Sequence, residues 1–337
     1  TYPKKVIKQV NAGIGGTGSS LGVYRINEQV LKYNPDLVFI EFATNDYKET
    51  RKSILESMEG MVRQVWQQCP NTDICFIYTF TMDMIENYQK GFAPYSILTM
   101  EELANHYQIP SINFAPDILK RLNDKKLFPM GNHSSRKDSL FFSGDGVHPY
   151  PETGHKYYAE TMSKSLTTLL QFPKRKKHKL RTVYFSDALV NARMLDVDDK
   201  LGISVNAHPL AQKLFNNLLP DIKLLKNDQE QIQFTFTGNK IGFLDVIGPF
   251  STQLKVEVDN DSPRYITRFD KFCSFTRMHW FFIENLGEGQ HNIKISIWPN
   301  QINKFKILDK NLSELKNIED YKEEYWQLGK ILLVNNI

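Results

Sequence analysis

The sequence has little cysteine. Its 337 residues include three cysteines, at Cys69, Cys75 and Cys273. They are scattered along the chain, with neither the spacing of a metal site nor the even number of a disulfide framework. We therefore expect buried or free thiols. No His/Cys spacing suits zinc, so we predict no metal site.

Long apolar runs and a strong charge of either sign are also missing. No run approaches the ~20 residues that a membrane span needs, so we predict no membrane span. The net charge of +4 is small for this length, which gives no electrostatic case for a nucleic-acid partner. No signal peptide is visible, which says little about the compartment because the chain opens inside what looks like a working domain.

What is present is enough for two domains. Hydrophobic residues make up 41% and charged residues 24%, which is ordinary for a globular protein. The first part alternates strand-like and helix-like segments. Apolar runs at 37–42, 74–78 and 111–114 are separated by segments with helical spacing, and a final helix begins at Pro151. This alternation predicts a parallel sheet with helices on both faces.

A glycine-rich turn, Asn11 to Ser19, lies between a predicted strand at 6–10 and a predicted helix from about residue 21. Glycine permits positive φ and lets backbone N–H groups face a ligand. We expect Ser19 or Ser20 to cap the helix. The glycine spacing matches neither the dinucleotide-binding fingerprint nor a phosphate loop, so the turn alone does not specify a ligand.

Two more polar clusters follow strands. Asn45-Asp46 comes directly after the strand at 37–42, and a long segment without periodicity, 127–144, leads to Asp145 and His148. Open α/β sheets bind ligands at the carboxyl ends of their strands. Here His148 can act as a general base, and Asp145 can fix its tautomer.

The same edge of the sheet offers hydrogen-bond donors. The backbone N–H of Gly16 and the side-chain amide of Asn45 can donate to an oxyanion that develops during acyl transfer. Asp46 is expected to be a structural hydrogen-bonding partner rather than a catalytic acid.

Three blocks together carry a family resemblance. Asn-Ala-Gly-Ile-Gly-Gly-Thr-Gly-Ser, Phe-Ala-Thr-Asn-Asp and Asp-Gly-Val-His-Pro, in this order and spacing, resemble blocks two, three and five of the SGNH (GDSL-type) hydrolases. The resemblance covers about residues 6 to 170. It implies a flavodoxin-like three-layer sandwich and hydrolysis of acyl esters, often acetyl groups on sugars, by a Ser-His-Asp triad. Ala43 replaces the usual glycine of the second of these blocks.

Carried over by position, the resemblance makes Gly16 and Asn45 the oxyanion-hole donors, Asp145 the orienting acid and His148 the base. The family's nucleophilic serine lies in a Gly-Asp-Ser block several tens of residues before the glycine turn. Only ten residues precede Asn11, and none is a serine. We therefore predict an N-terminally shortened chain that lacks the first strand and the nucleophile. We assign this role to none of the serines considered, Ser19, Ser20 and Ser143.

The second part of the sequence has a different pattern. We assign residues 1–172 to the α/β domain, 173–182 to a basic linker and 183–337 to an accessory β-sandwich. Apolar residues alternate with period two in several segments, with turn signals between them. The aromatic run Trp280 to Phe282 is either a stacking face for a sugar or part of the core. The tail, 321–334, either completes a sheet or lies along the first domain.

The leading hypothesis is a serine esterase or deacetylase that removes acetyl or other short acyl groups, on a carbohydrate, without a cofactor. Two alternatives stay open: a catalytically inactive glycan-binding protein on the same fold, and an O-acyltransferase, which needs an acyl donor and a site that excludes water. The expected partner is a small-molecule or glycan acyl ester. A glycan substrate favours an extracellular or cell-envelope location. The oligomeric state is not predicted.

Overall fold

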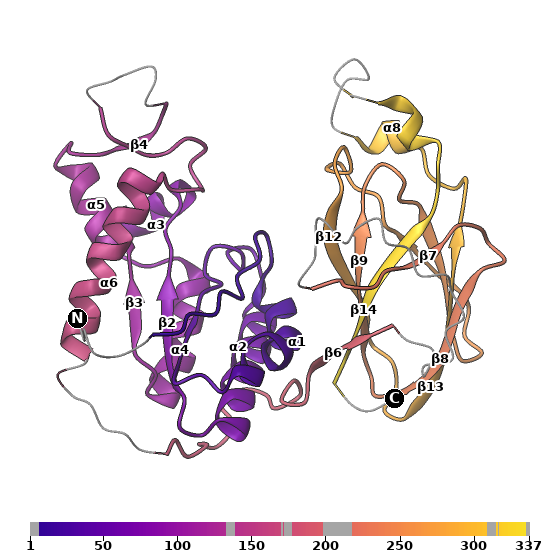
Figure 1. Ribbon diagram of the computed structural model, residues 1–337, viewed down its shortest axis with the longest axis horizontal. Coiled ribbons are helices and arrows are strands. Elements are labelled where there is room, and N and C mark those ends of the chain that lie inside the picture. Colours follow the sequence, from indigo (N-terminus) through magenta and orange to yellow (C-terminus); the bar gives the residue numbers. More distant parts are fainter. Residues whose placement is uncertain are drawn as a thin grey trace. The chain divides into compact units, whose positions relative to one another are not determined.

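The computed structural model describes residues 7–132, 139–169, 171, 177–197, 218–308, 315 and 317–334. The chain divides into two compact units, Thr1–Val190 and Asn191–Ile337, here called the α/β unit and the β unit (Figure 1). The described end of the predicted linker packs on the α/β unit, where the ring of His178 stacks on Trp66 with 4.7 Å between centroids. The division after Val190 lies beyond the predicted start of the second domain at residue 183.

The α/β unit is built on a parallel sheet. Its strands are β1 (Leu37–Ile40), β2 (Asp73–Tyr78) and β3 (Ser111–Asn113), in the order β1-β2-β3. The other elements are α1 (Ser19–Gln29), a 3-10 turn (Leu31–Tyr33), α2 (Arg51–Gln68), a 3-10 turn (Met82–Met84), α3 (Ile85–Gln89), α4 (Tyr95–Tyr107), α5 (Ala115–Asn123), β4 (Phe128–Met130), β5 (Phe141–Ser143), a π-helical turn (Pro151–His155) and α6 (Lys156–Leu169).

Both faces of this sheet are covered. On one face, Cys75 of β2 and Ile112 of β3 belong to a buried cluster with Ile118 of α5 and Tyr158 of α6. On the other, the hydroxyl of Tyr78 donates to Glu101 of α4 at 2.7 Å, and α4 packs with α2 and α2 with α1. Burial from both sides explains why the strand at 74–78 has a continuous apolar sequence. The predicted α/β fold with a parallel sheet is confirmed.

The strand predicted before the glycine turn is wrong for the residues described. Residues 7–10 form no regular secondary structure, and Ile7 is 84% exposed. A few alternating apolar residues make a strand only when a neighbouring strand supplies ladder hydrogen bonds, and no described strand pairs with this segment.

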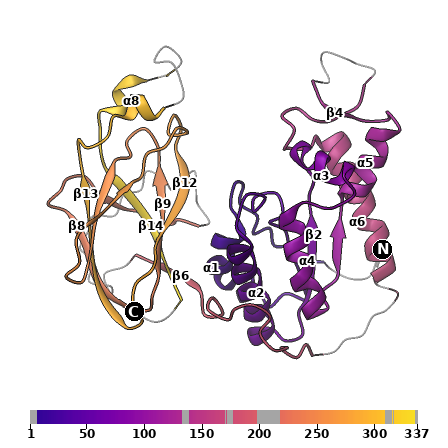
Figure 2. The same cartoon turned by 180° about the vertical axis from the view of Figure 1, so that it is seen from behind.

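The β unit consists of two antiparallel sheets packed together, as predicted (Figure 2). One has the order β11-β10-β13-β8, and the other has β12-β9-β14-β6, with β7 also paired to β14. The bounds are β6 (Arg193–Asp196), β7 (Lys223–Leu225), β8 (Gln231–Thr237), β9 (Ile241–Ile247), β10 (Gln253–Val258), β11 (Arg264–Thr267), β12 (Arg277–Ile283), β13 (Gln290–Trp298), α8 (Lys304–Ile307), a 3-10 turn (Ile318–Tyr321) and β14 (Trp326–Leu333).

Two questions left open by the sequence are answered by this packing. The tail completes a sheet, because β14 pairs with β9, β6 and β7. The central aromatic of the run at 280–282, Phe281, belongs to the core between the sheets, while its neighbours Trp280 and Phe282 are half-buried.

The core of the β unit also holds an ion pair. Arg268, 7% exposed, donates to both carboxylate oxygens of the fully buried Asp245, at 2.8 and 2.7 Å. The indole N–H of Trp326 donates to the same carboxylate at 2.9 Å. Both carboxylate oxygens of Asp245 therefore have donors, and such added hydrogen bonds are what makes a buried ion pair tolerable.

Candidate active site

The glycine turn and the Asn45 turn meet through Asp46. The carboxylate of Asp46 is fully buried and accepts the backbone N–H of Ser19 at 2.9 Å. The N-cap of α1 is Gly18, and a Cβ on Gly18 would lie 2.5 Å from Asp46 Oδ1. Glycine is therefore required where the two turns approach.

The predicted caps Ser19 and Ser20 are wrong. The cap comes instead from a carboxylate on a different strand connection, a tertiary contact that the local sequence does not encode. The expectation that Asp46 acts as a structural hydrogen-bonding partner is confirmed. Burial raises the pKa of Asp46 to about 6.

The turn that carries Asn45 is fixed to the end of β2. Glu41 accepts the N–H of Ala43 at 3.1 Å and the hydroxyl of Thr79 at 2.9 Å. The hydroxyl of Thr44 lies 2.7 Å from that of Thr79. Since Thr79 gives its single proton to Glu41, Thr44 is the donor in this pair. Burial raises the pKa of Glu41, and the hydrogen bonds from Thr79 act in the opposite direction.

The donors predicted for the oxyanion are exposed. Gly16 has a φ of +72°, a conformation that favours glycine. Among the residues that the structure describes, no group accepts the N–H of Gly16 and none pairs with the side-chain amide of Asn45. Both groups thus have a hydrogen available for a ligand.

Asp145 and His148 form a hydrogen-bonded pair. His148 Nδ1 lies 2.7 Å from Asp145 Oδ2, while Oδ1 of the same carboxylate accepts the N–H groups of Val147 and His148 at 2.9 and 2.8 Å. The bond to His148, with these backbone bonds, holds the pKa of Asp145 far below its usual range. The carboxylate stays ionised and accepts the Nδ1 proton. The His148 side chain is 85% exposed, and its Nε2 has no partner among the described residues.

A backbone hydrogen bond places the loop that holds Asp145 and His148 at the same end of the sheet. The carbonyl of Gly146 accepts the N–H of Met82, which follows β2, at 2.8 Å. The connection from β2 to the Asn45 turn passes through Thr79 and Thr44, and from there to the glycine turn through Asp46. A chain of short contacts thus links the segments that hold all the predicted site residues.

Sequence reasoning missed Glu41, Thr79 and the role of Ser143. The hydroxyl of Ser143 is fully buried, donates to Asp145 Oδ1 at 2.9 Å and accepts the N–H of Gly146 at 2.9 Å. It shapes the loop and does not bond to His148. A glutamate at the end of an otherwise apolar strand was a visible signal for Glu41, since a charge at such a place needs partners.

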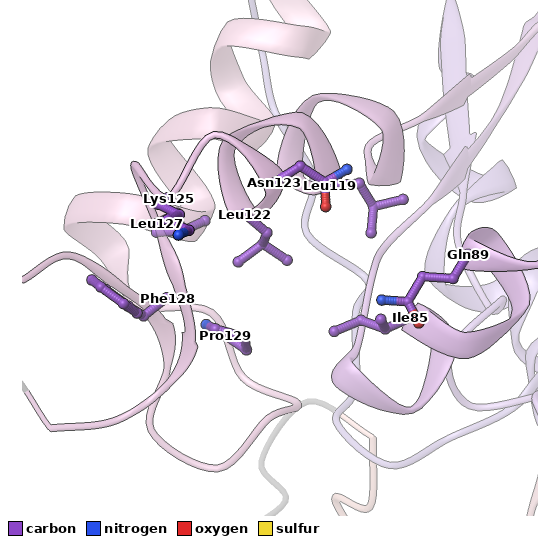
Figure 3. Close-up of a pocket in the computed structure, with 9 residues that line it drawn as sticks. All are labelled: Ile85, Gln89, Leu119, Leu122, Asn123, Lys125, Leu127, Phe128 and Pro129. Carbon is purple, nitrogen blue, oxygen red and sulfur yellow. The ribbon is translucent and has the colours of Figure 1, made fainter.

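A cavity of about 470 Å³ lies in the α/β unit between α3, α5 and β4 (Figure 3). Its lining is mostly apolar, with Ile85, Leu119 and Leu122 pointing into the space (Figure 3). None of the predicted site residues lines it. Within the described part of the chain, no three His, Cys, Asp or Glu side chains are grouped as metal ligands, and no helix is long and apolar enough to cross a membrane.

Comparison with known proteins gives a family match for the first part of the chain and a similar fold. Residues 2–156 match the family described as GDSL-like Lipase/Acylhydrolase. Two crystal structures of a two-domain esterase (CEX) active on acetylated mannans are similar to this chain, each covering 97% of it and 80% of the esterase chain. One, co-crystallised with mannopentaose, has 18% identity and a TM-score of 0.66; the other has 17% and 0.69. At such identity the likeness shows the fold. No curated protein matches the sequence.

Proposed function

We propose that this chain is an ester hydrolase of the SGNH type that removes acetyl or other short acyl groups from a carbohydrate. The observation that carries the proposal is the Asp145–His148 pair, whose Nε2 is exposed and without a partner among the described residues. The match of residues 2–156 to the GDSL-like family supports the same reaction class. The likeness to CEX makes acetylated mannan the first polysaccharide to test.

In the proposed mechanism, His148 Nε2 takes the proton of a serine hydroxyl as its oxygen attacks the ester carbonyl, and then returns it to the leaving alcohol. Asp145 holds Nδ1–H in place and stabilises the imidazolium. The N–H of Gly16 and the amide of Asn45 donate to the oxyanion. Water, activated by His148, releases the acid from the acyl-enzyme. We expect the serine in a Gly-Asp-Ser block outside the given sequence.

The test is hydrolysis of p-nitrophenyl acetate and acetylated mannan by the full-length protein, with the His148→Ala variant. The chain offers a matched control in His291, which forms an equally short bond to Asp259 in the β unit. We expect His148→Ala to lower kcat by about 10³-fold or more, and His291→Ala to leave it unchanged. Equal rates for wild type and His148→Ala would overturn the proposal and favour a non-catalytic protein.

A further inference from the structure

The four-stranded sheet of the β unit has an outward face with two neighbouring aromatic rings. Leu254, Val256 and Val258 of β10 are buried between the sheets, so the alternate residues of this strand point outward. Tyr265 of β11 lies opposite Lys255, and Trp298 of β13 lies opposite Gln253. Paired residues share a face, so both rings lie on the outward side, one on each side of β10.

The two rings are close together and open to solvent. Their centroids are 5.5 Å apart and their planes are inclined by 50°. Tyr265 is 49% exposed, and Trp298 is partly exposed. The ammonium of Lys255 lies 6.0 Å from the centre of the Trp298 ring. Core packing does not account for either ring, because the core of this unit lies on the opposite face of the sheet.

The rest of this face consists of hydrogen-bonding groups. By register, the side chains that share it are Gln231, Gln233, Thr235, Thr237, Gln253, Thr267, Gln290, Asn292 and Lys294, together with the buried Ser296. Amides and hydroxyls both donate and accept. Glu257 lies 2.9 Å from Lys255 and 4.0 Å from Lys294, so two cations share one carboxylate and these three side chains carry a net charge of +1.

We propose that this face, defined by Tyr265, Trp298, Lys255, Gln253 and Glu257, binds an uncharged polysaccharide. A sugar ring has an apolar C–H face, which packs on an aromatic ring, and a rim of hydroxyls, which needs mixed donors and acceptors. Because Glu257 partners both lysines, only one excess positive charge is left, whereas a polyanion site needs a cluster of unpaired cations, so a neutral ligand suits this face better. Charged residues at the centre of the face disfavour a protein partner, since interface cores are depleted in them.

This inference goes beyond the proposed function, because it uses residues of the β unit alone. The experiment is affinity electrophoresis and titration calorimetry of the full chain with glucomannan, galactomannan and xylan. We expect Trp298→Ala and Tyr265→Ala each to weaken binding about tenfold. Phe275→Ala, which removes a 55% exposed ring from a loop outside the sheet, is the matched control and is expected to bind like wild type.

A His148→Ala variant is expected to bind like wild type, which separates this proposal from the esterase. Thermal unfolding and circular dichroism are to be measured for each variant, to check that it is folded. The proposal is overturned if no neutral polysaccharide binds, or if folded Trp298→Ala and Tyr265→Ala both bind as wild type does. It is equally overturned if dextran sulfate binds more tightly than the neutral glycans, or if Trp298→Ala dissociates a dimer, which would identify the face as a protein interface.

Discussion

The two units each contain an Asp–His pair with the same Nδ1–oxygen distance, but the two histidines differ in their exposure to solvent. In both, a histidine Nδ1 lies 2.7 Å from a carboxylate oxygen: His148 from Asp145 in the α/β unit, and His291 from Asp259 in the β unit. The difference is at Nε2. In His291 this atom lies 2.8 Å from the carbonyl of Gly287 and the side chain is 11% exposed, whereas His148 is 85% exposed.

This difference has a chemical consequence. A carboxylate and a carbonyl oxygen only accept, so both ring nitrogens of His291 must carry protons. The bond to Asp259, together with the carbonyl, raises the pKa of His291. His291 joins two loops, and because both of its nitrogens bond to acceptors, neither is free to serve as a base. An Asp–His contact is therefore a candidate catalytic pair only when the second nitrogen faces solvent or substrate.

The sharpest test of this comparison replaces both carboxylates. Asp145→Asn is expected to lower kcat of the full-length protein by about 10³-fold or more. The amide of asparagine favours the tautomer of His148 with its proton on Nε2, and that nitrogen then cannot act as the base. Asp259→Asn is expected to leave kcat unchanged and to lower only the stability of the β unit. Steady-state kinetics on p-nitrophenyl acetate measure both. A comparable loss in the two variants would contradict the distinction.

The next test concerns the buried ion pair between Arg268 and Asp245 in the β unit. Arg268→Met leaves Asp245 ionised in the core with Trp326 as its remaining partner, and breaking a buried pair costs about 3–5 kcal/mol. We expect the free energy of unfolding of the β unit, measured in urea, to fall by that amount. The unfolding transition of the α/β unit is expected to stay unchanged. Lys255→Met, which breaks a part-buried pair with Glu257 on the sheet surface, is the control and is expected to cost about 1 kcal/mol or less.

At the site itself, Asn45→Ala is expected to lower kcat by about 10²–10³-fold with little change in KM, since in the proposed mechanism the amide acts on charge that develops in the transition state. Asn87→Ala is a control, because Asn87 is not one of the proposed oxyanion donors and its side-chain oxygen accepts the Tyr47 hydroxyl. An Asn45→Ala enzyme that keeps wild-type kcat would exclude the oxyanion role.

The smallest expected effect is a pH dependence of stability. Folding raises the pKa of Asp46 from 3.8 to about 6, so the folded state binds more protons than the unfolded state in this range. The free energy of unfolding therefore falls as pH rises between these values. Asp46→Asn keeps an oxygen that can accept the Ser19 N–H and is expected to remove this dependence. Urea titrations at pH 4, 5, 6 and 7 measure it; an unchanged slope would contradict it.

The sequence predicted what depends on periodicity and motif. The continuous run at 74–78 and the alternation in the second part indicated the two kinds of sheet, and His148 was proposed as a base because Asp145 precedes it at a spacing that permits a bond. It did not predict contacts between distant segments. The cap on α1 comes from Asp46, and the Asn45 turn is held by Glu41 and Thr79, which follow two different strands, β1 and β2.

The position of β14 has a consequence for biosynthesis. This strand is the last that the structure describes, yet it lies inside its sheet, between β9 on one side and β6 and β7 on the other. While the ribosome is still translating residues 191–325, those strands have no central neighbour to pair with. The α/β unit can acquire its native contacts during synthesis, whereas the β unit must wait for its final strand and is open to misfolding until then.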